Sequence, residues 1–274
     1  MQQTAPVLLG EYRATIEKRG EAAVRSSETL MASDSRDELF YIPFEWTNRQ
    51  ARLVIVGISP GSNQLQLAYR AASSKIKVGL TDEAVLKAAK VHGAFGSPTM
   101  RPNLIKMLDH FDFPQLLGIE KSEDLWGRHA DIFMGTSVVP HAAFRNGKPF
   151  AQSFDDVLKS PIFKESFERD FVSSLADIPS TAKFVALGRT PLDALTWCAR
   201  NGHIDSDQVM GAFAHPSTNG GSAVDAYLGL RSNFNDKDPV LKSLDRLRMF
   251  YQGMSKNTQA ARETNALAFE ASVP

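Results

Sequence analysis

Cysteine is almost absent from this chain of 274 residues, since Cys198 is the only one. A single thiol excludes internal disulfides, and it excludes zinc or iron–sulfur centres that need four cysteines from one chain. The six histidines show neither His-x-His nor His-x-x-x-His spacing, and no carboxylate cluster accompanies them. We therefore expect a protein without metal and without cofactor.

Long apolar runs and a net charge are also lacking. No apolar run approaches the ~18–20 residues of a membrane span, and the first residues lack the basic-then-apolar pattern of a secretory signal. We therefore expect no membrane association and a cytoplasmic location. The 31 basic residues balance 31 acidic ones. This balance argues against a histone-like nucleic-acid binder but allows an enzyme with a local basic groove.

Four short apolar segments, separated by segments with helical periodicity, are present instead. They cover residues 53–56, 130–139, 183–187 and 209–214. This order predicts a three-layer α/β/α sandwich around a short, mainly parallel four-stranded sheet. We expect one domain over residues 1–253, in which residues 1–35 form an N-terminal helical cover. Residues 254–274 have weak periodicity, which predicts a partly disordered tail.

The turn after the first apolar strand is the strongest local signal. The run 53–56 stops at Gly57, and Pro60-Gly61 leads into a helical pattern. Free backbone N–H groups and the positive end of a helix meet there at the carboxyl edge of a sheet, where α/β proteins bind ligands. A tight strand–helix connection without a function explains this segment alone equally well.

Polar or glycine-rich segments follow all four expected strands. They are Gly57-Ile58-Ser59-Pro60-Gly61, Ser137 with the later His141, Gly188-Arg189-Thr190, and His215-Pro216-Ser217. The loop Phe95-Gly96-Ser97-Pro98 follows the first of them. Because the carboxyl ends of parallel strands share one edge, we expect these segments to converge.

Together these segments resemble the uracil-DNA glycosylase superfamily. GISPG is similar to its first motif and HPSTNGG to its second, while AFGSPTMRPNLIKML resembles its aromatic loop and KFVALGRTPLDAL its third strand and helix. The resemblance covers roughly residues 40–235, in the family's order. It implies an enzyme, expected to act as a monomer on DNA, that extrudes a nucleotide and hydrolyses the N-glycosidic bond.

The resemblance also suggests a role for each site residue. As catalytic residues, Ser59 would orient the attacking water and His215, as a neutral imidazole, would stabilise the leaving base. The expected substrate-binding residues are Gly57, Ile58, Pro60, Gly61, Phe95, which would stack on the base, Ser137, which would line the pocket floor, and His141. The expected DNA-binding residues are Ser97, Arg101, Arg145, Lys148, Arg189, Ser217, Thr218, Asn219 and Gly220. Residues 143–154 are polar and basic, which predicts an exposed loop.

Three departures from the family's pattern bear on the substrate. Members with high uracil activity carry Asp or Asn where this chain has Ser59, and the iron–sulfur members carry Glu at Ile58. The Asn that reads the uracil edge is matched by Ser137, whose hydroxyl cannot supply the paired donor and acceptor of an amide. These shorter side chains suggest a larger substrate, such as the bulky modified pyrimidines of bacteriophage DNA.

Other interpretations stay open at the level of sequence. The chain could be a weak uracil-DNA glycosylase, or a module that binds modified or abasic DNA without cutting it. It could also be an unrelated α/β hydrolase of small molecules, with His215 as an ordinary turn histidine. The sequence identifies neither the base nor the biological setting, repair or anti-phage defence.

Overall fold

Four buried strands form a parallel sheet at the centre of the computed structural model, which describes residues 8–216 and 221–272, with the backbone alone for 221, 222 and 265–272. The strand order is β4 (Phe133–Ser137), β3 (Leu53–Gly57), β7 (Lys183–Leu187) and β8 (Val209–Phe213). Each strand matches one of the four apolar segments, so the predicted parallel sheet is confirmed.

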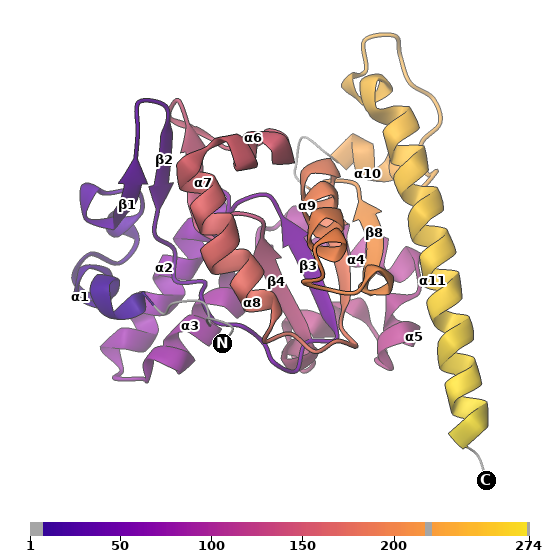
Figure 1. Cartoon of the computed structure of the whole chain (residues 1–274), viewed down its shortest axis with the longest axis horizontal. Helices are drawn as coiled ribbons and strands as arrows, with labels where there is room; N and C mark the ends of the chain where they lie inside the picture. The colour runs from indigo at the N-terminus through magenta and orange to yellow at the C-terminus, as the bar shows by residue number, and fades with distance from the viewer. Residues whose placement is uncertain (1–7, 217–220, 273–274) are drawn as a thin grey trace.

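Helices cover both faces of this sheet, which confirms the three-layer arrangement (Figure 1). In Figure 1, α7, α8 and α9 lie in front of the parallel strands, α4 lies behind them, α2 and α3 lie to their left, and α11 runs along the β8 edge. The α-helices are α1 (Leu9–Arg19), α2 (Ser62–Lys77), α3 (Asp82–Gly93), α4 (Met100–His110), α5 (Phe113–Leu117), α6 (Phe154–Lys159), α7 (Pro161–Ser166), α8 (Ser173–Leu175), α9 (Arg189–Arg200), α10 (Gly221–Tyr227) and α11 (Leu244–Ser272). Shorter helical turns are η1 (Gly20–Ala23), η2 (Ser27–Thr29), η3 (Ser122–Trp126), η4 (Ala130–Ile132), the π-helical η5 (Phe167–Val172), η6 (Ser206–Gln208) and η8 (Pro239–Ser243). No helix in these described ranges has the length and apolar character needed to cross a membrane.

A second, antiparallel sheet was not predicted. It contains β1 (Leu30–Ser33), β2 (Asp37–Phe40), β5 (Ala142–Arg145) and β6 (Lys148–Pro149), in that order. The expectation of an exposed loop over residues 143–154 is therefore wrong for residues 143–145, which lie on the buried strand β5, whereas residues 146–149 and 151–153 are exposed. Strands of two to four residues, one of them ending in proline, carry too little periodicity to be recognised in a sequence.

Two helix boundaries also differ from the predictions. Within the N-terminal helical cover expected over residues 1–35, α1 ends at Arg19, because Gly20 takes a left-handed φ of 53° and the chain then turns toward β1. At the other end, α11 does not stop near residue 253 but continues to Ser272. Its middle is held by packing: Met254 is fully buried, and the Asn257 side chain donates to the carbonyl oxygens of β8.

Candidate functional site

The turn after β3 is attached to the chain that follows β4. The pairing of the two strands continues past their ends, as the Val138 and Val139 amides donate to the carbonyls of Gly57 and Ile58. The Ser59 hydroxyl then donates to the carbonyl of His141 at 3.1 Å and accepts the Ala143 amide at 2.9 Å. Pro60 is buried, whereas a Cβ atom built on Gly61, the N-cap of α2, would meet nothing within 4 Å.

The Phe95 ring lies against the ends of β3 and β4. A Cβ atom on Gly57 would lie 3.4 Å from Cε1 of this ring and 3.5 Å from Oγ of Ser137, and one on Gly135 would lie 2.9 Å from Cε2. The Phe95 backbone is left-handed, with φ 53°, and its amide donates to the Gln64 side chain at 3.3 Å. Three predicted site residues that are distant in sequence are therefore in contact. Phe95 is only 2% exposed, so a base can stack on it only after neighbouring atoms move aside.

The end of β8 is joined to the Phe95 loop through α4. The Ser97 hydroxyl accepts the Met100 amide at the start of this helix, and Asn103 Nδ2 donates to the carbonyl of Pro216 at 3.0 Å. His215 reaches the surface, yet desolvation by surrounding protein lowers the pKa of its imidazole. A lowered pKa keeps the ring neutral near pH 7. The predicted phosphate contacts Ser217, Thr218, Asn219 and Gly220 lie outside the described residues.

The four predicted cationic DNA contacts have different surroundings. Arg145 is buried and donates through Nε and Nη2 to both carboxylate oxygens of Asp37, so its predicted place on an exposed loop is wrong. Arg189 is exposed but bonds Asp193, and Lys148 is exposed on β6. Arg101, in the first turn of α4, stacks on the Trp126 ring at 5.4 Å, and its buried Nε has no acceptor. Among the described residues, Arg101 is thus the half-buried guanidinium that lacks a carboxylate partner beside the Phe95 loop.

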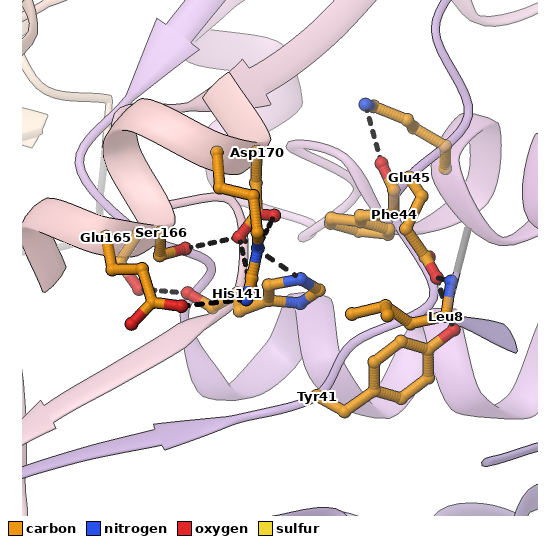
Figure 2. Close-up of polar contacts among 11 residues, drawn as sticks. Leu8, Tyr41, Phe44, Glu45, His141, Glu165, Ser166 and Asp170 are labelled. Carbon is orange, nitrogen blue, oxygen red and sulfur yellow. Dashed lines mark hydrogen bonds and ion pairs between the residues drawn. The ribbon is translucent and has the colours of Figure 1, made fainter. Parts of the chain in front are cut away.

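His141 lies inside the protein rather than at a substrate surface. The residue is 2% exposed, and its Nε2 faces Oδ2 of Asp170 at 3.7 Å (Figure 2). The Ser166 hydroxyl and the Arg169 guanidinium donate to the Asp170 carboxylate. Burial lowers the pKa of His141 to about 4, so its ring is neutral at pH 7. No sequence pattern indicated a role for Asp170, which lies in the π-helical segment η5.

A buried acid–base pair lies beside this histidine. Glu45 accepts hydrogen bonds from the Leu8 amide and the Tyr41 hydroxyl, and Lys90 donates to the carbonyl of Phe44 at 2.7 Å (Figure 2). Desolvation raises the pKa of Glu45 to about 7 and lowers that of Lys90 to about 7. Sequence reasoning missed both residues. Lys90 stands among apolar residues in the sequence of the segment that forms α3, and this was the available signal.

These ionisable groups do not form a metal centre. Within residues 8–216 and 221–272, no three histidine, cysteine, aspartate or glutamate side chains are grouped so that they could hold a metal ion. The cluster consists instead of cations and anions in hydrogen-bonding and ionic contact. Its chemistry is that of proton sharing and charge positioning.

Comparison with known proteins gives one relative. The chain is 31% identical over 180 residues to the uncharacterized protein YoxB of Bacillus subtilis (strain 168), an alignment that covers 65% of this chain and 70% of the relative. No protein-family model matches the chain, and no solved structure matches it.

Proposed function

Since the chain belongs to the family of the uncharacterized Bacillus subtilis protein YoxB, which brings no activity with it, we propose a function from the site alone: a DNA glycosylase. The enzyme extrudes a damaged or modified base from DNA and hydrolyses its N-glycosidic bond with water, leaving an abasic site. It acts as a monomer in the cytoplasm.

The contact of Gly57, Phe95 and Ser137 is the observation that supports this proposal most directly. Three segments that resemble separate motifs of one superfamily meet at the carboxyl ends of two adjacent strands. A tight turn of no function, considered for the first segment alone, does not require an aromatic ring and a hydroxyl at the same place. The Phe95 ring lies so near the strand end that a Cβ atom on Gly57 would be in van der Waals contact with it.

Hydrolysis of an N-glycosidic bond depends only weakly on a general base. Cleavage of an N-glycosidic bond places positive charge on the sugar and negative charge on the leaving base, so preorganised dipoles supply most of the stabilisation. A neutral His215 can donate a hydrogen bond to the leaving base without first losing a proton. The first turn of α2, at Gly61, offers backbone amides to an approaching phosphate.

Arg101 is the cation best placed to bind the target strand. It follows the Phe95 loop by six residues, and no acidic residue neutralises it in the described part of the chain. The Arg101 guanidinium lies over the Trp126 ring, with Cζ 5.4 Å from its centroid, and its planar fork of donors suits bidentate binding of a phosphate. Arg145 has no such role, because Asp37 already occupies its donors.

The small side chains at the site favour a large substrate base. Ser59 and Ser137 replace longer residues of the resembling family, and a serine hydroxyl cannot read a uracil edge. We therefore propose a pyrimidine with a bulky substituent, as in modified bacteriophage DNA, rather than plain uracil.

A second candidate function is recognition of modified or abasic DNA without cleavage. The Ser59 hydroxyl favours it, because its proton is already donated to the carbonyl of His141 and it already accepts the Ala143 amide. A serine with both bonds made has one lone pair left for a water. This is a weaker arrangement than a carboxylate would provide.

Base release distinguishes the two functions. The purified chain is incubated with duplexes that contain uracil, hypoxanthine or substituted cytosines, free bases are identified by mass spectrometry, and abasic sites are revealed by alkaline strand cleavage. The glycosylase predicts release of one substituted pyrimidine, in a single turnover, at a rate that His215→Ala abolishes. Tight binding with no release from any duplex supports the non-cleaving module, and neither binding nor release rejects both.

A further inference from the structure

A small pocket lies beside His141. Its volume is about 20 Å³, and its lining includes Glu45, Thr47, Lys90, Thr136, His141 and Asp170. A space of this size accommodates one water molecule, which needs two to four polar partners. Hydroxyl, carboxylate, ammonium and imidazole groups all face this cavity, so the lining is polar enough to hold it.

One lining residue has a polar atom without a well-formed hydrogen bond. Nδ1 of His141 is fully buried and has no partner of good hydrogen-bond geometry among the described residues, although the Ile42 backbone acts on the ring and raises its pKa. The charged Asp170 carboxylate near Nε2 favours the tautomer with its proton on that nitrogen, which leaves Nδ1 as an acceptor. Lys90 uses one of its three donors on Phe44. Nδ1 of His141, which can accept a hydrogen bond, and Nζ of Lys90, which can donate further ones, therefore belong to residues that line the same pocket.

The backbone of His141 leads from this cavity to the proposed site. Its carbonyl oxygen accepts the Ser59 hydroxyl, and two residues later the Ala143 amide donates to the same hydroxyl. On the Nε2 side of the His141 ring, Asp170 belongs to a π-helical segment, a rare conformation that is frequent at functional sites. Whatever fixes the His141 ring also fixes the carbonyl that orients Ser59.

We propose that one water molecule occupies this cavity as a hydrogen-bond donor to Nδ1 of His141, and that His141 is thereby a positioning residue for Ser59. The ring is held between Asp170 on Nε2 and the water on Nδ1. Its carbonyl in turn holds the Ser59 hydroxyl in the orientation that the attacking water requires. The catalytic part of this inference rests on the proposed glycosylase function, whereas the water and the coupling of the two residues do not.

A crystal structure of the whole chain tests the water directly. We expect one ordered water within hydrogen-bond distance of Nδ1 of His141, and we expect it to be absent in His141→Leu. A dry cavity in the wild-type protein overturns the proposal.

Unfolding in urea tests the coupling without any need for activity. The variants are His141→Leu, Ser59→Ala and the double variant, with Thr258→Val as the matched control because Thr258 is also buried and polar but lies on α11. We expect the change in the unfolding equilibrium constant caused by Ser59→Ala to be at least fivefold smaller in the His141→Leu background. In the Thr258→Val background it should be unchanged. Equal effects in both backgrounds overturn the positioning role.

Kinetics on the released base then separate positioning from general stability. His141→Leu should lower kcat about tenfold with KM nearly unchanged, and this loss should disappear in the Ser59→Ala background. His141→Asn, which keeps a polar atom near the position of Nδ1, should recover most of the rate, whereas a Thr258→Val variant should keep it. If His141→Asn is as slow as His141→Leu, the proposal fails. If the wild-type chain releases no base from any duplex, the glycosylase function fails, and the crystal structure and the unfolding cycle still decide the present inference.

Discussion

The two sheets of this protein treat their polar groups in opposite ways. In the antiparallel sheet, Asp37 on β2 binds Arg145 on β5 and also accepts the Ser160 hydroxyl. At the carboxyl edge of the parallel sheet, no described residue lies within 4 Å of a Cβ atom built on Gly61, and Arg101 has no acidic partner in the described part of the chain. The charged groups of the antiparallel sheet bind each other inside the folded protein. The polar groups at the carboxyl edge of the parallel sheet remain available to bind a ligand.

The pKa of Asp37 reflects this difference. Burial by itself raises the pKa of this carboxyl, but the hydrogen bonds from Arg145 and Ser160 outweigh burial and lower it. At His215 desolvation by the surrounding protein lowers the pKa of the imidazole. Both pKa values are therefore lowered, but by hydrogen bonds from Arg145 and Ser160 at Asp37 and by burial at His215.

The largest expected effect comes from removing the buried ion pair of the antiparallel sheet. Asp37→Ala removes both hydrogen bonds that the buried Arg145 makes to a carboxylate and leaves it only Gln152 and the more distant Asp156, so it should lower the free energy of unfolding by about 3–5 kcal/mol. Urea denaturation followed by circular dichroism measures it. Asp193→Ala, which removes the partner of the exposed Arg189, is the control and should cost less than about 1 kcal/mol. Equal losses would contradict the distinction between the two regions.

The decrease in the free energy of unfolding at acid pH should depend on His141. Its pKa falls from 6.5 to about 4 on folding, so this contribution is present above pH 6.5 and is lost as pH falls toward 4. The loss should be of the order of 3 kcal/mol, at about 1.4 kcal/mol per pKa unit. Two groups that face His141 have other pH dependences. The raised pKa of Glu45 stabilises the folded protein below pH 4.5, and this stabilisation is lost as pH rises toward 7. The lowered pKa of Lys90 destabilises the folded protein as pH falls from 10.5 to 7. The His141 contribution is therefore read from the difference between wild type and His141→Gln at pH 4.5 and 7.5, which should shrink at the lower pH.

Removal of the His215 imidazole, the proposed hydrogen-bond donor to the leaving base, tests the carboxyl edge of the parallel sheet. His215→Ala should lower single-turnover base release on the order of 10²-fold, the usual effect of losing one preorganised donor, with little change in stability. His203→Ala is the matched control, because His203 is also exposed but lies after α9, stacked on Trp197. A His215→Ala enzyme of wild-type rate would exclude this residue from the mechanism.

Two glycines beside Phe95 give a paired test of the site. Gly135→Ala would bring a Cβ atom within 2.7 Å of the Ala94 Cβ and 2.9 Å of the Phe95 ring, so it should displace the ring and cost about 1–3 kcal/mol. Gly57→Ala meets the same ring at 3.4 Å, an ordinary contact, and should fold almost as stably as wild type. Unfolding midpoints measure both variants. A tolerated Gly135→Ala together with a destabilised Gly57→Ala would mean that the ring lies elsewhere.

The smallest effect concerns a single phosphate contact. Arg101→Met should weaken DNA binding and reduce the slope of log affinity against log salt by about one unit, as expected for one lost phosphate contact. Arg145→Met is unsuitable as a control because it would unbalance Asp37, so Arg189→Met, with its partner Asp193 nearby, serves instead and should change the slope less. An unchanged slope in Arg101→Met would remove this residue from the DNA interface.

Much of the proposed site could be predicted because its residues follow strands with a clear pattern. Runs such as residues 53–56 and 183–187 are apolar and short, which marks buried parallel strands, and the residues after them must then share an edge. Asp37, Arg145 and Asp170 could not be found in this way. They lie on strands of four residues or in a π-helical turn, where local periodicity carries no information and distant pairing decides the structure.

The sequence by itself determined the parallel sheet and which residues follow its strands, since apolar runs longer than a turn must be buried and their order limits how they pair. Only the tertiary structure decided which polar groups those residues meet. It buried Arg145 against Asp37, enclosed His141 between Asp170 and a cavity, and left Arg101 without an acidic partner. The physical reason is that the strength of a charge or hydrogen bond depends on the partners and solvent around it, which segments distant in the chain supply.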